Sequence, residues 1–186
     1  EVEDSVYIDG LMTEKVIRDI KKLKNSKHPF FLTAGFISPH LPFNAPKKYW
    51  DIYPRASIKL PYNNFIPKNA PALSISNWPE MRAYSGIPKS GPVSDSLAKT
   101  LIHGYYATVS YTDALIGKII STLKAAQLYD NTIIILVSDH GYNLSEHTQW
   151  AKFTTHKISS QVPLIISAPN YRENVSSSAL VELVDV

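Results

Sequence analysis

The 186-residue sequence contains no cysteine, which excludes a disulfide framework, a thiolate metal site and a cysteine nucleophile within these residues. It has no apolar run of the roughly 18 residues that a membrane span requires, and its acidic first residues lack the pattern of a signal peptide. The net charge of +3 is too small to indicate nucleic-acid binding. With 44% hydrophobic and 19% charged residues and no internal repeat, the sequence is typical of one folded globular domain.

One apolar run and the loop after it dominate the sequence. Residues 132–137 (TIIILV) are typical of a strand that is buried on both faces in a parallel sheet. The run is followed by Asp139, His140 and Gly141, and the glycine allows a sharp turn. Ligands of open α/β sheets bind beyond the carboxyl ends of the strands. We therefore expect Asp139 and His140 to lie in a binding site.

Helices and strands alternate along the rest of the chain. We expect a first helix with Thr13 as its N-cap, a strand over residues 30–36, a long helix over 94–124 capped by Ser94, and a third strand over 162–167. This order predicts an α/β fold with a mainly parallel sheet flanked by helices. The apolar positions that recur every three to four residues are Val16, Ile17, Ile20 and Leu23 in the first helix, and Leu97, Leu101, Tyr105, Val109, Thr112, Ile116, Ile119 and Leu123 in the long helix.

Two connecting segments bear on function. His40 follows the first expected strand and lies between Pro39 and Pro42, which hold this loop in a fixed shape. If the strands are parallel, His40 and Asp139 share one edge of the sheet. Residues 44–92 have no clear period but carry several aromatic side chains. An ordered loop that faces substrate and a simple cover for the sheet are equally compatible with them.

The polar side chains on these loops suit an anionic, tetrahedral substrate. Asp139 and His140 can hold a divalent cation that polarises a substrate oxygen, and Lys152 offers a positive charge for the oxygens of an anion. His40 can protonate a leaving group, and His147 belongs to the same loop as Lys152. The ordinary alternatives are that Asp139 closes a turn, that the histidines are structural and that Lys152 is a surface lysine.

Several segments resemble the sulfatase family. Residues 138–152 (SDHGYNLSEHTQWAK) resemble its second signature, in which a strand ends in S-D-H/N-G and the chain continues to G-E-H-x-x-W-x-K. Residues 35–54 (GFISPHLPFNAPKKYWDIYP) resemble the P-H-x-P-F segment of the iduronate-2-sulfatase-like branch, and residues 104–123 resemble the Y-x-A-x-V-x-Y-x-D-x-x-x-G helix of the same enzymes. The likeness extends over about residues 29–186.

The resemblance implies a calcium-dependent sulfuric ester hydrolase of the alkaline phosphatase superfamily that acts on sulfated sugars or polysaccharides. By this likeness Asp139 and His140 are calcium ligands, Lys152 contacts the sulfate, and His40 lies beside the sulfate or leaving-group oxygen. The resemblance also implies a secreted, periplasmic or lysosomal protein. The residues that we assign to substrate binding are His147 and Trp150.

The sequence departs from the family pattern in two ways. Ser145 replaces the glycine before Glu146, and the family's first half, with two metal-binding aspartates and a C/S-x-P-x-R motif, has no counterpart. The Cys or Ser of that motif becomes the formylglycine nucleophile, so this chain has no nucleophile. We expect residues 1–186 to be a partial sulfatase catalytic domain, cut at both ends, without the nucleophile half and the small C-terminal subdomain. Such a chain is expected to be inactive alone and to expose an apolar face of its sheet.

Three functions remain open from the sequence. They are a sulfatase acting on sulfated sugars, a phosphate or phosphonate ester hydrolase on the same fold, and a non-catalytic module that binds anionic glycans. An upstream C/S-x-P-x-R motif would select the first function. An upstream Thr or Ser nucleophile, or further Asp/His pairs for two metal ions, would select the second. Absence of any upstream half would favour the third.

Overall fold

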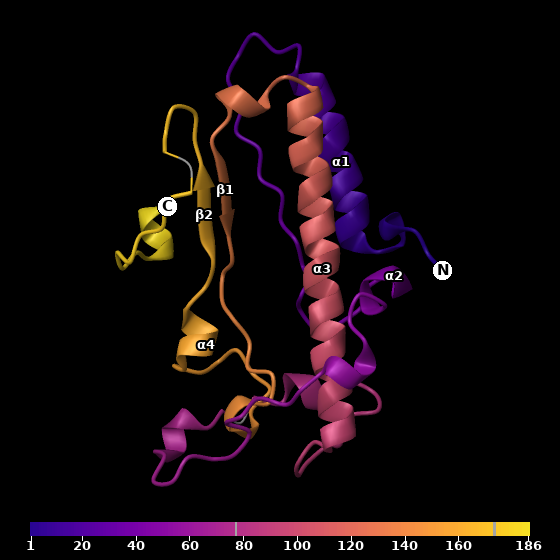
Figure 1. Cartoon of the computed structure of the whole chain (residues 1–186), viewed down its shortest axis with the longest axis vertical. Coiled ribbons are helices and arrows are strands. Elements are labelled where there is room, and N and C mark those ends of the chain that lie inside the picture. Colours follow the sequence, from indigo (N-terminus) through magenta and orange to yellow (C-terminus); the bar gives the residue numbers. More distant parts are fainter. Residues whose placement is uncertain (77, 173) are drawn as a thin grey trace.

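The computed structural model describes residues 1–76, 78–172 and 174–186. The two long helices lie side by side on one side of the molecule, and a two-stranded sheet stands on the other side (Figure 1). No helix within these ranges combines the length and the apolar character that crossing a bilayer needs. The helices and strands are α1 (Ile8–Leu23), α2 (Lys47–Trp50), α3 (Asp95–Ala125), β1 (Ile134–Val137), α4 (Lys157–Ser160) and β2 (Leu164–Ser167).

Helix α1 begins well before the expected cap at Thr13, so that prediction is wrong. Thr13 lies inside the helix, where its hydroxyl donates a 2.8 Å hydrogen bond to the carbonyl of Asp9, one turn earlier. A threonine bonded in this way satisfies its hydroxyl without ending the helix. Val16 and Ile20 are buried as predicted, and they pack with Leu123 of α3.

Helix α3 begins after Ser94, whose hydroxyl accepts a 3.3 Å hydrogen bond from the backbone N–H of Leu97, as predicted. Its buried face is rotated from the predicted stripe, because Val109 is 43% exposed. Small residues mark the true face: a Cβ atom added at Gly104 would lie 2.8 Å from the Trp50 ring. A pattern of large apolar side chains alone therefore misplaces this face. The most buried apolar side chains of α3 are Ala98, Ile102, Ala107, Tyr111 and Leu115.

Residues 30–36 are extended, but the strand predicted there is absent from the part of the chain that the structure describes. Burial still alternates along the segment as it does along a strand. Leu32 and Ala34 pack against the contact between α1 and α3, whereas Phe31 is 96% exposed. The segment has the side-chain pattern of a strand but pairs with no strand among the residues that the structure describes.

Strands β1 and β2 pair in antiparallel orientation, with Ile134 opposite Ser167 and Val137 opposite Leu164. Both strands lie inside the predicted ranges, but a mainly parallel sheet is not confirmed. Burial on both faces is also not observed, because Ile135 is 45% exposed. Ile166, its partner on β2, is 56% exposed, so this face of the sheet is open among the described residues.

Residues 44–76 and 78–92 contribute side chains to a core that they share with α3. Ile58 and Met81 are buried together with Ile102 of α3 and with Trp150. The segment therefore covers the helical layer, and it also brings exposed residues toward the loops after the strands. The aromatic side chains that pack near α3 include Tyr49, Trp50 and Tyr53, and the exposed ones include Tyr62, Phe65 and Trp78.

Candidate active site

The loop that carries His40 is fixed by the helical layer. Asp9 of α1 is buried, and its two carboxylate oxygens accept the backbone N–H groups of Ile37 and Ser38, each at 2.9 Å. The His40 ring places Nδ1 2.7 Å from the carbonyl oxygen of Leu41. A carbonyl can only accept, so Nδ1 carries a hydrogen and Nε2 is the nitrogen available to other groups.

The loop that carries Lys152 is held by a buried asparagine. Asn143 is 0% exposed, and its Nδ2 donates to the carbonyl of Ala151 at 2.7 Å and to the hydroxyl of Ser159 at 2.8 Å. The backbone N–H of Asn143 donates to the same carbonyl at 2.9 Å. A buried amide is costly to leave unbonded, so these bonds fix the residue that precedes Lys152.

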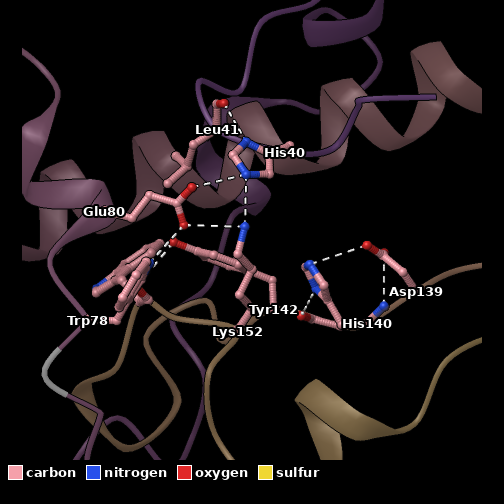
Figure 2. Close-up of polar contacts among 10 residues, drawn as sticks. His40, Leu41, Trp78, Glu80, Asp139, His140, Tyr142 and Lys152 are labelled. Carbon is pink, nitrogen blue, oxygen red and sulfur yellow. Dashed lines mark hydrogen bonds and ion pairs between the residues drawn. The ribbon is translucent and has the colours of Figure 1, made fainter. Parts of the chain in front are cut away.

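His40 and Lys152 meet although they are 112 positions apart in the sequence (Figure 2). Lys152 Nζ lies 2.8 Å from His40 Nε2. The carboxylate of Glu80 lies beside both, with Oε1 3.0 Å from His40 Nε2 and Oε2 3.4 Å from Lys152 Nζ. The Lys152 side chain is only 14% exposed, so solvent screens its charge less than it would screen a surface lysine.

Two aromatic side chains accompany Glu80 (Figure 2). Trp78 Nε1 donates a 3.2 Å hydrogen bond to Glu80 Oε2. Burial raises the pKa of the Tyr142 hydroxyl, and the negative charge of Glu80 adds to this effect. Tyr142 therefore stays protonated and donates a 3.1 Å hydrogen bond to the carbonyl of Trp150. The carboxylate of Glu80 therefore lies between the polar groups of His40 and Lys152 and the aromatic side chains of Trp78 and Tyr142.

Asp139 and His140 form a second group of side chains after β1 (Figure 2). The Asp139 side chain is 82% exposed, and its Oδ1 accepts the backbone N–H of His140 at 2.9 Å. In the His140 ring, Nδ1 lies 2.8 Å from the carbonyl of Gly141 and Nε2 lies 3.6 Å from Asp139 Oδ2. Gly141 itself passes close to α4, where an added Cβ would lie 1.9 Å from the carbonyl of Ile158. Only glycine fits this turn.

The Asp139–His140 pair fits part of a metal site. An exposed carboxylate and an imidazole can each bind a divalent cation, but calcium takes about six to eight oxygen ligands. In the ranges that the structure covers, no three His, Cys, Asp or Glu side chains are grouped so that they could hold a metal ion. A calcium ion at Asp139 therefore needs further oxygen ligands.

The other two predicted site residues, His147 and Trp150, lie apart from the cluster of His40, Glu80 and Lys152. Trp150 is 7% exposed and packs in the core with Leu41 and Phe43. His147 lies against His156, with ring centroids 5.1 Å apart, and its Nδ1 is buried. Among the described residues, no hydrogen bond or ion pair joins either side chain to Lys152.

The sequence analysis missed two residues, Glu80 and Asn143, that hold His40 and Lys152 in place. Glu80 lies in the irregular segment 44–92, where no periodicity or motif marks it, and only the fold brings it to His40. Asn143 lies inside the signature segment, at a position that the quoted family pattern does not mark. Its position between Tyr142 and Leu144 was the available signal, because an amide between large apolar residues often serves a buried hydrogen-bond network.

A family model described as Sulfatase matches residues 3–186. The chain belongs to the sulfatase family. Iduronate 2-sulfatase of Homo sapiens is 33% identical to this sulfatase chain over 175 residues, which cover 91% of the chain and 32% of that protein. A sulfatase of Formosa agariphila is 36% identical over 166 residues, covering 88% and 32% of the two chains. The chain thus spans about a third of the length of these relatives.

Solved structures agree on the fold of this sulfatase chain. The yidJ protein of Bacteroides fragilis matches it with a TM-score of 0.64 at 27% identity, covering 86% of this chain and 30% of that one. A phosphonate monoester hydrolase of Silicibacter pomeroyi matches with a TM-score of 0.72 at 23% identity, covering 92% and 34% of the two chains. The second likeness concerns the fold alone.

Proposed function

We propose that this chain carries the anion-binding half of the active site of a sulfuric ester hydrolase whose substrates are sulfated sugars or polysaccharides. The observation that supports this most is the meeting of His40 and Lys152 at 2.8 Å. Their two loops are fixed separately, one by Asp9 and the other by Asn143. Donors held in place in a partly buried site suit an anion whose charge persists through the reaction.

The two residues have different roles in hydrolysis, in which water cleaves the ester and releases sulfate and an alcohol. Lys152 has three N–H donors, and Glu80 accepts one of them when His40 holds its proton on Nε2, so two remain for sulfate oxygens. His40 Nε2 acts at the leaving-group oxygen and gives a proton to the departing alcohol. A sugar alcohol is a poor leaving group, so this proton matters most for sugar substrates.

We propose calcium as the metal, held in part by Asp139 and His140. The bound cation would polarise a sulfate oxygen and offset developing negative charge. The 82% exposed carboxylate of Asp139 is free to bind it. Calcium prefers oxygen ligands, so Asp139 is the stronger ligand of the two.

The proposal requires residues beyond these 186, and we call the chain together with those residues the complete protein. No C/S-x-P-x-R motif occurs in this sequence, so the formylglycine nucleophile and the other metal-binding aspartates come from elsewhere in the complete protein. The exposed face at Ile135 supports a fold in which elements outside these residues cover the sheet, and we propose that further strands at its edges make it mainly parallel. Residues 1–186 are then a partial catalytic domain that is inactive alone. Family resemblance favours a secreted, periplasmic or lysosomal location.

The test compares sulfate and phosphorus esters as substrates of the complete protein. We expect calcium-dependent release of sulfate from a sulfated sugar and much slower cleavage of a phosphonate monoester. Lys152→Ala removes most of this activity, whereas Lys15→Ala, at a 69% exposed position on α1, retains it. Faster cleavage of the phosphonate than of any sulfated sugar would favour a phosphonate ester hydrolase. Binding of sulfated glycans without turnover would favour a non-catalytic module.

A further inference from the structure

Glu80 contacts both members of the proposed anion-binding pair. It begins the 3-10 turn η4 (Glu80–Ala83), and the following residue, Met81, is 2% exposed in the core. The backbone of the turn is therefore fixed by packing. From there the Glu80 carboxylate points at His40 and Lys152 (Figure 2).

Both carboxylate oxygens of Glu80 are engaged. Oε1 lies 3.0 Å from His40 Nε2. Oε2 lies 3.4 Å from Lys152 Nζ and accepts the 3.2 Å hydrogen bond from Trp78 Nε1. The Glu80 side chain is 21% exposed, so it is partly withdrawn from solvent. A carboxylate that faces three donors in this way is held in one position by them, whereas a surface carboxylate is solvated and mobile.

The charges at the site give a physical reason for this carboxylate. Lys152 is a cation, and His40 becomes one whenever it holds the proton that it gives to a leaving group. Two cations whose nitrogens lie 2.8 Å apart repel each other strongly in a partly desolvated site. Glu80 offsets this repulsion. Before substrate binds, it also accepts from Nε2 of the protonated ring, which holds the ring in place until the leaving-group oxygen takes this N–H.

We propose that Glu80 is a positioning residue for sulfate ester hydrolysis, which holds His40 and Lys152 in place for the transition state and opposes binding of the anionic substrate in the ground state. This inference rests on the proposed function. Its two effects have opposite signs. Orientation of the donors raises kcat, whereas a negative charge beside the sulfate raises KM. A residue that only stabilised the fold would not lower KM when it is replaced.

The decisive variant is Glu80→Gln in the complete protein with calcium, because glutamine keeps the shape and removes the charge. On a sulfated sugar we expect kcat to fall on the order of 10²-fold, as misplaced catalytic groups produce. We expect KM and the inhibition constant of inorganic sulfate to fall about 5-fold, because a partly exposed like charge is removed. Trp78→Phe, which removes one donor to Glu80, is expected to change kcat and KM in the same directions by less.

The matched control is Glu14→Gln, which neutralises a 52% exposed carboxylate on α1 and is expected to leave both constants unchanged. The proposal is overturned if Glu80→Gln turns over like this control. It is also overturned if Glu80→Gln raises KM while kcat falls, since that pattern indicates general damage to the site.

Histidine NMR of the complete protein separates a failure of this proposal from a failure of the proposed function. The ring signals of His40 are those that disappear in His40→Ala. At constant pH they should move in Glu80→Gln and stay in place in Glu14→Gln, whether or not the protein cleaves sulfate esters. Unmoved signals overturn the role of Glu80 even if hydrolysis is found. Moved signals in a protein without sulfatase activity would support the contact and reject only the proposed function.

Discussion

The two groups of candidate site residues differ in how completely this chain builds them. The Lys152 side chain is 14% exposed and the His40 side chain 38%, and the two lie 2.8 Å apart beside the carboxylate of Glu80. Asp139 and His140 contact mainly each other and their own turn, and the Asp139 side chain is 82% exposed. Figure 2 shows the two groups as separate sets of contacts. We infer that the chain fixes the anion-binding half of the site, whereas the metal-binding half depends on ligands from outside it.

The claim that this chain builds the anion-binding half of the site fails most clearly if Lys152 is dispensable. In the complete protein, Lys152→Ala should lower kcat/KM for a sulfated sugar on the order of 10³-fold, because a fixed donor to the sulfate is lost. Both constants should change, since the sulfate is negative in the ground state and in the transition state. Steady-state kinetics beside the Lys15→Ala control measure this. A variant within a few-fold of the parent would make Lys152 a structural residue.

His40→Ala tests the second member of the anion-binding half. We expect kcat on a sulfated sugar to fall on the order of 10²-fold, as the loss of a general acid produces. The loss should shrink on nitrophenyl sulfate, because nitrophenol leaves without a proton. Equal losses on the two substrates would remove the leaving-group role and leave His40 as a residue that only positions its neighbours.

Asp139→Asn tests the metal-binding half. Removing one charged oxygen ligand should weaken calcium binding to the complete protein on the order of 10-fold or more, with activity restored in part at high calcium concentration. Calorimetry of calcium binding measures the affinity directly. Parent-like affinity and turnover would show that Asp139 only closes the turn before Gly141.

The smallest expected effect concerns the helical layer that supports the anion-binding half. Asp4 is 5% exposed and pairs with Lys118 Nζ at 2.5 Å and Lys48 Nζ at 2.8 Å. Burial by itself opposes ionisation, but the hydrogen bonds from Lys118 and Lys48 outweigh it and lower the pKa of Asp4. Because the pKa of Asp4 is lower in the folded state than in the unfolded state, ionised Asp4 stabilises the folded protein at a pH above the unfolded-state pKa. This stabilisation is lost as the pH falls through the folded-state pKa.

Asp4→Asn should therefore lower the free energy of unfolding at pH 7 by about 1–2 kcal/mol, a figure reduced because the lysines are half exposed. Denaturant unfolding of the complete protein at pH 7 and at acid pH measures the difference. The gap between variant and parent should narrow as the pH falls through the folded-state pKa. A gap that widens at acid pH would contradict the sign of this argument.

Local signals predicted the elements that depend on local chemistry. Ser94 caps α3, and the strand ranges contain β1 and β2. The predicted strand over residues 30–36 lacks a partner here because strand pairing depends on distant residues. The buried face of α3 was misplaced because the neighbours that pack on Gly104 are distant in sequence.

The candidate site could be predicted only where a motif marked it. His40, Lys152 and Asp139 lie in segments that resemble sulfatase motifs, and the structure brings the first two together. Glu80 carries no such mark, because its place at the site depends on packing of the turn that follows Trp78. The burial of Trp150 was also not accessible from spacing, since a tryptophan in a signature can face either the core or a ligand.

The most direct measurement is a crystal structure of the complete protein with inorganic sulfate and calcium. We predict sulfate oxygens about 3 Å from Lys152 Nζ and His40 Nε2, with Glu80 still beside both nitrogens and with Asp139 bound to the cation. Sulfate bound elsewhere, with Lys152 still closed onto Glu80 and no sulfate oxygen within hydrogen-bonding distance of it, would contradict the claim that this chain supplies the anion-binding half of the active site.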